Sequence, residues 1–149
     1  MRLHTGQHLL SARVFSRTGL RTVKATLSGS SASLDLEREL PLAMVAELEA
    51  DMRDALEHPH PISIRMVPRA EWDVGSYAPR SGLVPLAPQV DPVRVVEIHA
   101  EDACPCGGTH VRSTREIGSV EIAAPVATGT GGSRLGFTLR EPDAPTPPE

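Results

Sequence analysis

The chain has 149 residues, of which 40% are hydrophobic and 3% aromatic, and its net charge at pH 7 is −4. That length predicts a single domain, which buries about two thirds of the surface that the unfolded chain exposes. We exclude a membrane protein, because no segment has the roughly 20 apolar residues of a membrane helix. The N-terminus has no signal-peptide pattern, and the two cysteines lie in one Cys-Pro-Cys run. We therefore exclude a disulfide-rich secreted protein and expect a cytoplasmic one.

A helix and a hairpin are predicted in the first part of the chain. Residues 3–17 have helical periodicity, and Gly19 is a suitable stop because glycine adopts the left-handed conformation of a helix C-cap. Residues 22–27 and 31–36 have the composition of strands, and the Ser-Gly-Ser turn at residues 28–30 indicates a hairpin between them.

The middle of the chain predicts a second helix and two strands. Residues 42–57 have helical periodicity, and the His-Pro sequence that follows ends the helix. Residues 62–67 alternate as a half-buried strand, and residues 79–92 are rich in proline and predict an irregular loop. Residues 93–98 predict a strong strand that leads straight into the turn around Cys106.

The last part of the chain predicts two more strands and a tail. Residues 119–124 and 135–140 are strands, separated by a glycine-rich turn at residues 128–133. Residues 141–149 contain four prolines and predict a disordered tail. The expected organisation is one α+β domain at residues 1–140, with a mostly antiparallel sheet and two main helices packed on one side of it.

Two short pairs of potential metal ligands lie at opposite ends of the predicted domain. His4 and His8 are one helical turn apart on one helix face, and Cys106 and His110 flank a Gly-Gly turn that lets their side chains converge. Each pair alone is a weak indication, but one of the two cysteines and three of the six histidines fall into the pairs. Together they supply a tetrahedral donor set for one zinc ion. Cys104 is either a spare ligand or a bystander that binds no metal, and we favour the second interpretation.

The charges are unevenly distributed. Residues 1–34 contain five basic side chains and no acidic one, whereas acidic side chains cluster at residues 35–57 on a helix that we expect to face solvent. A basic end that also carries metal ligands indicates a face for nucleic acid. An ordinary solvated helix face explains the same charges equally well.

Two motifs resemble the editing domain of alanyl-tRNA synthetase and its free-standing relatives, the AlaX proteins. They are HTGQHLLS at residues 4–11 and CGGTHV at residues 106–111, and supporting segments match at residues 22–27, 94–98, 116–118 and 131–134. The resemblance covers residues 3–139. Threonyl-tRNA synthetase editing domains are related, so the resemblance indicates the reaction class better than the amino acid. No aminoacylation core is present, and the chain is either a minimal AlaX protein or a fragment.

The resemblance implies one zinc ion, bound by His4, His8, Cys106 and His110. It also implies a reaction in trans, in which the ester bond that joins serine, and often glycine, to mischarged alanine tRNA is hydrolysed. Such editing is needed because apolar contacts discriminate small side chains by only about 10–200-fold. A closed four-ligand site is typical of structural zinc, whereas catalytic zinc keeps one position open. We favour zinc that positions the substrate and supplies positive charge.

Further residues are candidates for catalysis and substrate binding. Gln7 is a candidate for positioning water or the amino group of the substrate, and the amides of Gly107 and Gly108 for binding an oxyanion. Thr26, with Ser33 as the alternate, is a candidate for sensing the serine hydroxyl. Each also has a purely structural explanation, as a helix, turn or strand residue. Four basic side chains are candidates for phosphate contacts with the tRNA acceptor end: Arg2, Arg13, Lys24 and Arg134.

Two alternatives remain open. The chain could be a deacylase for another small misacylated amino acid, or a zinc-stabilised RNA-binding module without catalysis. The intact ligand set and glycine turn favour activity.

Overall fold

The computed structural model describes residues 1–74 and 86–140. The helices are α1 (Arg2–Thr18), α2 (Met44–Glu57), α3 (Arg69–Val74) and the 3-10 helix η1 (Thr114–Ile117). The strands are β1 (Thr22–Ser28), β2 (Ser31–Leu36), β3 (Ile62–Val67), β4 (Val93–Ile98), β5 (Asp102–Pro105), β6 (Val120–Ile122), β7 (Val126–Ala127) and β8 (Ser133–Leu139). The predicted tail at residues 141–149, and residues 79–85 of the predicted loop, lie outside the described residues.

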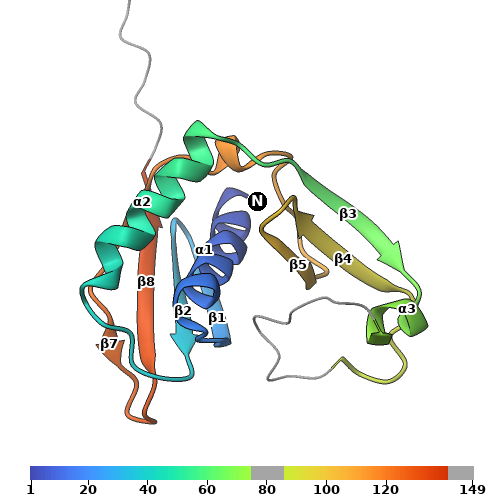
Figure 1. The fold of residues 1–149 in the computed structure, drawn as a ribbon, viewed down its shortest axis with the longest axis horizontal. Coiled ribbons are helices and arrows are strands. Elements are labelled where there is room, and N and C mark those ends of the chain that lie inside the picture. The colour runs from blue at the N-terminus through green and yellow to red at the C-terminus, as the bar shows by residue number, and fades with distance from the viewer. Residues whose placement is uncertain (75–85, 141–149) are drawn as a thin grey trace, which may run out of the picture.

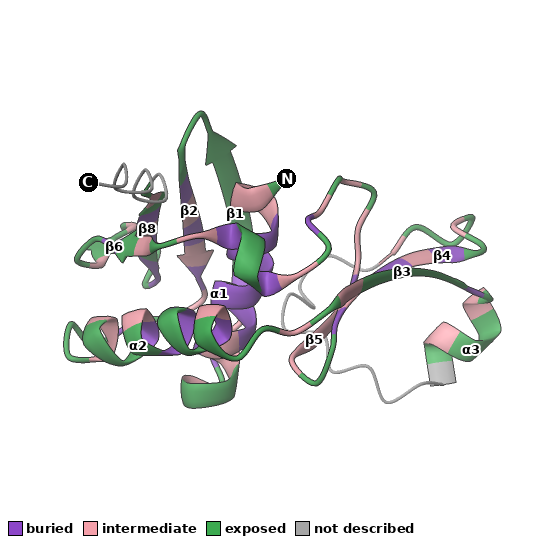
Figure 2. Cartoon of the chain, turned by 90° about the horizontal axis from the view of Figure 1, so that it is seen from above, coloured by how far each residue is buried: buried purple, intermediate pink, exposed green. Residues whose placement is uncertain are grey.

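The strands form two antiparallel sheets. The larger sheet has the order β1-β2-β8-β6, with β7 also paired to β8, and the smaller sheet has the order β3-β4-β5. Helices α1 and α2 lie on the same side of the larger sheet (Figures 1 and 2). The predicted α+β class is therefore confirmed, although the sequence analysis did not predict the division into two sheets.

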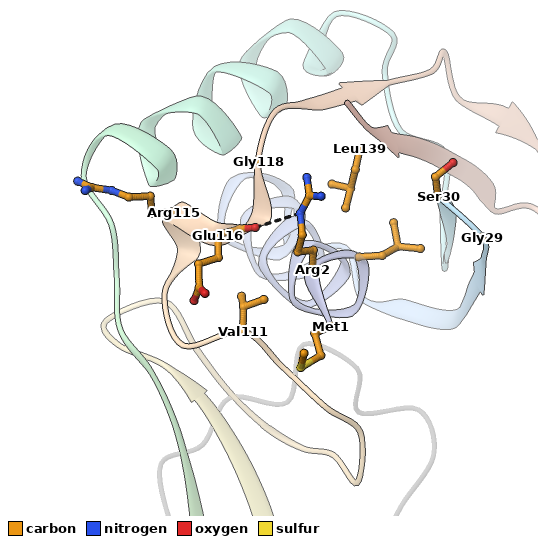
Figure 3. A pocket seen from close by; sticks show the side chains of 10 residues that line it. Met1, Arg2, Gly29, Ser30, Val111, Arg115, Glu116, Gly118 and Leu139 are labelled. Carbon is orange, nitrogen blue, oxygen red and sulfur yellow. Dashed lines mark hydrogen bonds between the residues drawn. The ribbon is translucent and has the colours of Figure 1, made fainter. Parts of the chain in front are cut away.

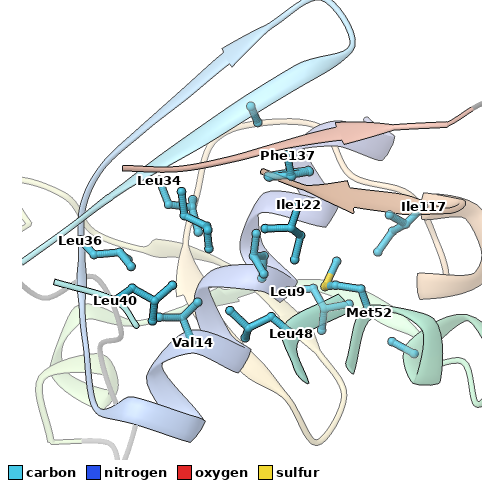
Figure 4. Packing of buried hydrophobic residues seen from close by; sticks show 14 of the residues in the cluster. Leu9, Val14, Leu34, Leu36, Leu40, Leu48, Met52, Ile117, Ile122 and Phe137 are labelled. Atoms are coloured by element: carbon cyan, nitrogen blue, oxygen red, sulfur yellow. The ribbon is translucent and has the colours of Figure 1, made fainter. Parts of the chain in front are cut away.

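The main core lies between the larger sheet and its two helices. Leu9 of α1 and Leu48 and Met52 of α2 pack against a sheet face that includes Phe137 (Figure 4). Helix α1 lies close to this face at Gly6, where a Cβ atom would lie 3.5 Å from the Phe137 ring, at ordinary contact distance. Figure 2 shows that α1 is largely buried, whereas α2 exposes one side.

Helix α1 and the first hairpin follow the sequence prediction closely. Gly19 caps α1 with φ of 74°, and its amide donates to the carbonyl oxygen of Phe15. Gly29, with φ of 60°, lies in the turn between β1 and β2. A left-handed backbone at both positions explains the choice of glycine.

The smaller sheet differs from the prediction in two respects. Strand β3 is an edge strand and is mostly exposed rather than half-buried, with Ile64 49% and Met66 58% accessible. Strand β4 does not lead straight into the Cys106 turn, because the chain reverses after Ile98 and adds β5 antiparallel to β4. Helix α3 was not predicted, since six residues are too few to show helical periodicity. Within the described part of the chain, no helix has both the length and the apolar character needed to cross a bilayer.

Candidate metal centre

The four predicted metal ligands converge. His4 and His8 lie one turn apart on α1, whereas Cys106 and His110 lie in the segment that follows β5. One donor atom from each of the four side chains lies within 4.8 Å of every other. His8 is buried, and the other three residues are partly accessible.

The spacing of the donors fits a tetrahedral ion. The Nε2 atoms of His4 and His8 are 3.2 Å apart, and Cys106 Sγ is 3.5 Å from Nε2 of both His4 and His110. A zinc ion with ordinary bond lengths separates two nitrogen ligands by about 3.3 Å and a sulfur from a nitrogen by about 3.5 Å. Three imidazoles and one thiolate are also donors that zinc prefers.

The glycine pair between Cys106 and His110 has one member that the packing requires. A Cβ atom on Gly108 would lie 2.3 Å from Cε1 of His4, whereas one on Gly107 would meet no atom within 4 Å. The Gly108 amide donates to Cys106 Sγ at 3.4 Å. Of the two amides considered for an oxyanion, that of Gly108 is thus directed at the thiolate.

Arg94 of β4 holds the ligand turn in place. Its Nη1 donates to the carbonyl oxygens of Cys106 at 2.6 Å and Gly108 at 2.9 Å. The sequence analysis noted Arg94 only as part of a matching segment. No short-range pattern indicates the contact, because it joins two segments separated by β5.

A second group of potential ligands shares His8 with the first. His8, Asp102 and Cys104 also present donor atoms within 4.8 Å of one another. The Asp102 carboxylate lies 3.9 Å from His8 Nδ1, the nitrogen that does not face His4. Cys104, which we expected to be a bystander, is buried beside the centre but is not among the four converging ligands.

Gln7 belongs to a buried polar chain. It is 6% accessible, and its Nε2 donates to Ser11 Oγ at 3.3 Å, while Ser11 Oγ lies 2.6 Å from Thr22 Oγ1. The sequence analysis singled out neither Ser11 nor Thr22. The spacing of Gln7 and Ser11, one helical turn apart, was the available signal.

The structure does not bring Thr26 and Ser33 to the ligand cluster. These two residues are cross-strand partners, so their side chains share a face of the sheet. Leu34, next to Ser33, is fully buried in the core beneath α1. Since neighbouring residues of a strand point to opposite faces, Thr26 and Ser33 lie on the face away from α1.

The predicted phosphate-binding residues have intramolecular partners in three of the four cases. Arg2 Nε donates to the carbonyl oxygen of Glu116, Arg13 pairs with Glu101 at 2.7 Å, and Arg134 pairs with Asp35 at 2.7 Å. Lys24 is exposed on β1. The charges of Arg13 and Arg134 are thus partly neutralised by carboxylates within the fold.

The acidic side of α2 is not uniformly solvent-facing. Asp51 is 8% accessible and accepts hydrogen bonds from Nε and Nη2 of Arg17. These bonds raise the pKa of Arg17. Asp51 thus ties α2 to α1, whereas Glu47, Asp54 and Glu57 of the same helix are exposed, as expected.

We expect Arg134→Gln to raise the pKa of Asp35. Hydrogen bonds from Arg134 hold this pKa below its ordinary value. Because the pKa is lower in the folded state, the pair stabilises the fold above about pH 4, and this stabilisation is lost as pH falls through the folded-state value. NMR titration of Asp35 checks the shift, and Arg140→Gln, which removes the exposed pair with Glu121, is the control. An unchanged Asp35 titration in Arg134→Gln would contradict the assignment.

An open groove lies beside the N-terminal end of α1. It has a volume of about 730 Å³, and its lining includes Leu3, Val111 and Ser30 (Figure 3). Leu3 and Val111 are direct neighbours of the ligands His4 and His110. Arg2 also lines the groove, and its guanidinium is anchored to η1 by the bond to the Glu116 carbonyl.

Comparisons with known proteins find similarity to two related groups. Residues 93–136 match the family described as the threonyl and alanyl tRNA synthetase second additional domain. The chain is 27% identical to the alanyl-tRNA editing protein AlaX-L of Pyrococcus horikoshii over 82% of its own length and 29% of that protein. It is 27% identical to AlaX-M of Methanosarcina barkeri, over 93% of this chain and 58% of that protein. It is 34% identical to the alanine–tRNA ligase of Cenarchaeum symbiosum, over 91% of this chain and 15% of the ligase. The chain thus spans between 15% and 58% of the length of these relatives.

Proposed function

We propose that this chain, which has an AlaX-like domain, hydrolyses the ester bond of wrongly charged alanine tRNA in trans, with serine as the main substrate and glycine as a second one. The convergence of His4, His8, Cys106 and His110 into one tetrahedral donor set carries the proposal. The similarity of the chain to proteins named for alanyl-tRNA editing supports the choice of substrate.

The four ligands are suited to a single zinc ion. A zinc ion held there supplies positive charge near the ester and helps to fix the substrate. The residues of the chain itself have other tasks. Arg94 and Gly108 fix the ligand turn, and the groove beside Leu3 and Val111 receives the terminal nucleotide. A groove with apolar walls next to polar donors is typical of small-ligand sites.

Selection of the substrate amino acid requires polar groups near the metal centre. A site that hydrogen-bonds the serine hydroxyl rejects alanine, which would leave those groups unpaired. Gln7 lies between the ligands His4 and His8 in the sequence, and its buried side chain already belongs to a polar network. Because the Gly108 amide donates to Cys106 Sγ, only the Gly107 amide remains a candidate for binding the oxyanion that forms during ester hydrolysis.

Contacts to the tRNA backbone come from basic side chains around the groove. Arg2 and Arg115 both line it, and Lys24 is exposed on β1. Such contacts orient a nucleic acid without reading its sequence.

We expect Cys106→Ala to abolish hydrolysis of serine-charged alanine tRNA, because it removes the single thiolate of the donor set and so changes both the hold on the ion and its charge. The measurement is the release of serine, glycine and alanine from the charged tRNAs by the purified protein. Cys104→Ala, which removes the other thiol, is the matched control and should retain activity. Equal loss of activity in both variants, or full activity in Cys106→Ala, would contradict the proposal.

Removal of the metal separates a functional from a structural role. Loss of hydrolysis by a chelator with an unchanged circular dichroism spectrum supports a metal that acts in the reaction, and unfolding indicates a structural metal. Retained zinc and RNA binding without hydrolysis of any substrate would instead favour the non-catalytic RNA-binding module. Hydrolysis of a different small misacylated amino acid would change the substrate but keep the reaction class.

A further inference from the structure

The hydroxyl of Thr5 is hydrogen-bonded to one of the candidate metal ligands, His110. Thr5 is fully buried in the first turn of α1, and its Oγ1 is 3.0 Å from Nδ1 of His110. The other ring nitrogen of His110, Nε2, faces Cys106 Sγ at 3.5 Å. Thr5 and the cluster thus contact opposite sides of the same imidazole ring.

The hydroxyl of Thr5 contacts three partners. If Nε2 of His110 is to be free for a metal, only one placement of the protons satisfies all three hydrogen bonds. The hydroxyl donates to the carbonyl oxygen of Met1 at 3.1 Å and accepts from the amide of Val111 at 3.2 Å. A hydroxyl has one proton and two lone pairs. With its proton directed to Met1, the hydroxyl uses its second lone pair to accept a hydrogen bond from the Nδ1–H group of His110, and His110 then presents an unprotonated Nε2 to the cluster.

We infer that Thr5 is a positioning residue that holds His110 in the tautomer with a proton on Nδ1, so that Nε2 can bind the metal. Histidine ligands commonly donate their other ring N–H to an oxygen, which fixes both tautomer and ring orientation. Here the acceptor lies on α1, beside His4, while His110 comes from the far end of the sequence. The same hydroxyl therefore joins the two halves of the ligand set. This inference rests on the proposed metal site but not on the substrate, and its test measures metal affinity directly.

Two substitutions separate the hydroxyl from the shape of the side chain. Thr5→Val keeps the branched shape but removes the acceptor for both N–H groups, whereas Thr5→Ser keeps the hydroxyl. Loss of a group behind a metal ligand typically lowers affinity by about 10–100-fold. We expect Thr5→Val to weaken zinc binding to this extent, as measured by competition with a chromophoric chelator, and Thr5→Ser to bind zinc within a few-fold of the unchanged protein.

A double-mutant cycle with His110→Ala shows whether Thr5 acts through His110. If it does, Thr5→Val has little further effect on the affinity of His110→Ala. An equal loss in both backgrounds would show a general structural effect and would overturn the inference. Thermal unfolding of each protein at saturating zinc checks that the variants are folded.

A measurement on the unchanged protein keeps the inference testable if Thr5→Val does not fold. In the zinc-loaded protein, NMR should detect a slowly exchanging proton on Nδ1 of His110 with a nuclear Overhauser effect to Thr5. Absence of a proton on Nδ1, or rapid exchange of it with water, would overturn the inference.

Discussion

Replacing Gly108 by alanine is expected to lower zinc affinity by about 100-fold or more. This is the upper end of the losses that follow when a residue in contact with a metal ligand is changed. The added Cβ would lie 2.3 Å from Cε1 and 2.6 Å from Nδ1 of the His4 ring. The ring cannot remain in place at such distances, so either His4 leaves the cluster or the turn that carries Cys106 moves away from α1. Either displacement separates the ligands that form the tetrahedral set.

The adjacent glycine provides the control for this substitution. A Cβ on Gly107 would meet no atom within 4 Å. Gly107→Ala makes the same chemical change one residue away, and we expect its zinc affinity to stay within a few-fold of that of the unchanged protein. Isothermal titration of both variants gives the comparison. Similar affinities for the two variants would show that His4 does not need the space beside Gly108.

Phe137→Ala is expected to lower the free energy of unfolding by about 3–5 kcal/mol, the usual cost of truncating a buried aromatic side chain to alanine. Phe137 is 2% accessible and is central to the sheet face that receives α1 (Figure 4). Since a domain is stable by only about 5–15 kcal/mol, much of the stability would be lost. Urea unfolding measures the change, and Phe137→Leu, which leaves a smaller cavity, should cost clearly less.

Zinc should partly compensate for this loss. A ligand that binds only the folded state at about 100 times its dissociation constant adds about 2.7 kcal/mol to the stability. The midpoint of Phe137→Ala unfolding should therefore rise when zinc is added, whereas a variant that also carries Gly108→Ala should show a much smaller rise. A similar rise in both proteins would mean that zinc stabilises the fold at another place.

The sequence predicted the main helices and the two pairs of potential ligands because both depend on short-range spacing. Helix α1 is apparent from its periodicity, and the hairpin from its glycine turn. His4 and His8 share a helix face wherever the helix packs. Cys106 and His110 are similarly close along the chain, so the sequence identified both pairs without long-range information.

The face on which Thr26 lies could not be predicted, because it depends on an irregularity in β1. Thr22 pairs with Leu36 on the side of the core, but the register shifts between Thr22 and Lys24. In a regular strand, Thr22 and Thr26 would point to the same face. The bulge directs Thr22 toward Ser11 of α1 and Thr26 away from it. Nothing in the residue types of this segment marks the position of the bulge.

The partners of the basic residues were also beyond the sequence analysis. The pairs of Arg13 with Glu101 and of Arg134 with Asp35 join positions 88 and 99 residues apart. Charge counting along the chain assigned the basic and acidic residues to separate regions, but folding brings them together. Such pairs depend on how α1, α2 and the sheets are arranged, which periodicity does not indicate.

The ligand set also determines when the metal can be bound during synthesis of the chain. His4 and Cys106 are 102 positions apart, and ribosomes add about 5–20 residues per second, so His4 is made roughly 5–20 s before Cys106. During this interval the nascent chain offers only a pair of imidazoles, which by the general affinity order favours copper over zinc. Once Cys106 and His110 have been added, the thiolate completes the tetrahedral set. A tetrahedral metal site can therefore form only after residue 110 has been added, when η1 and strands β6 to β8 are still to be made.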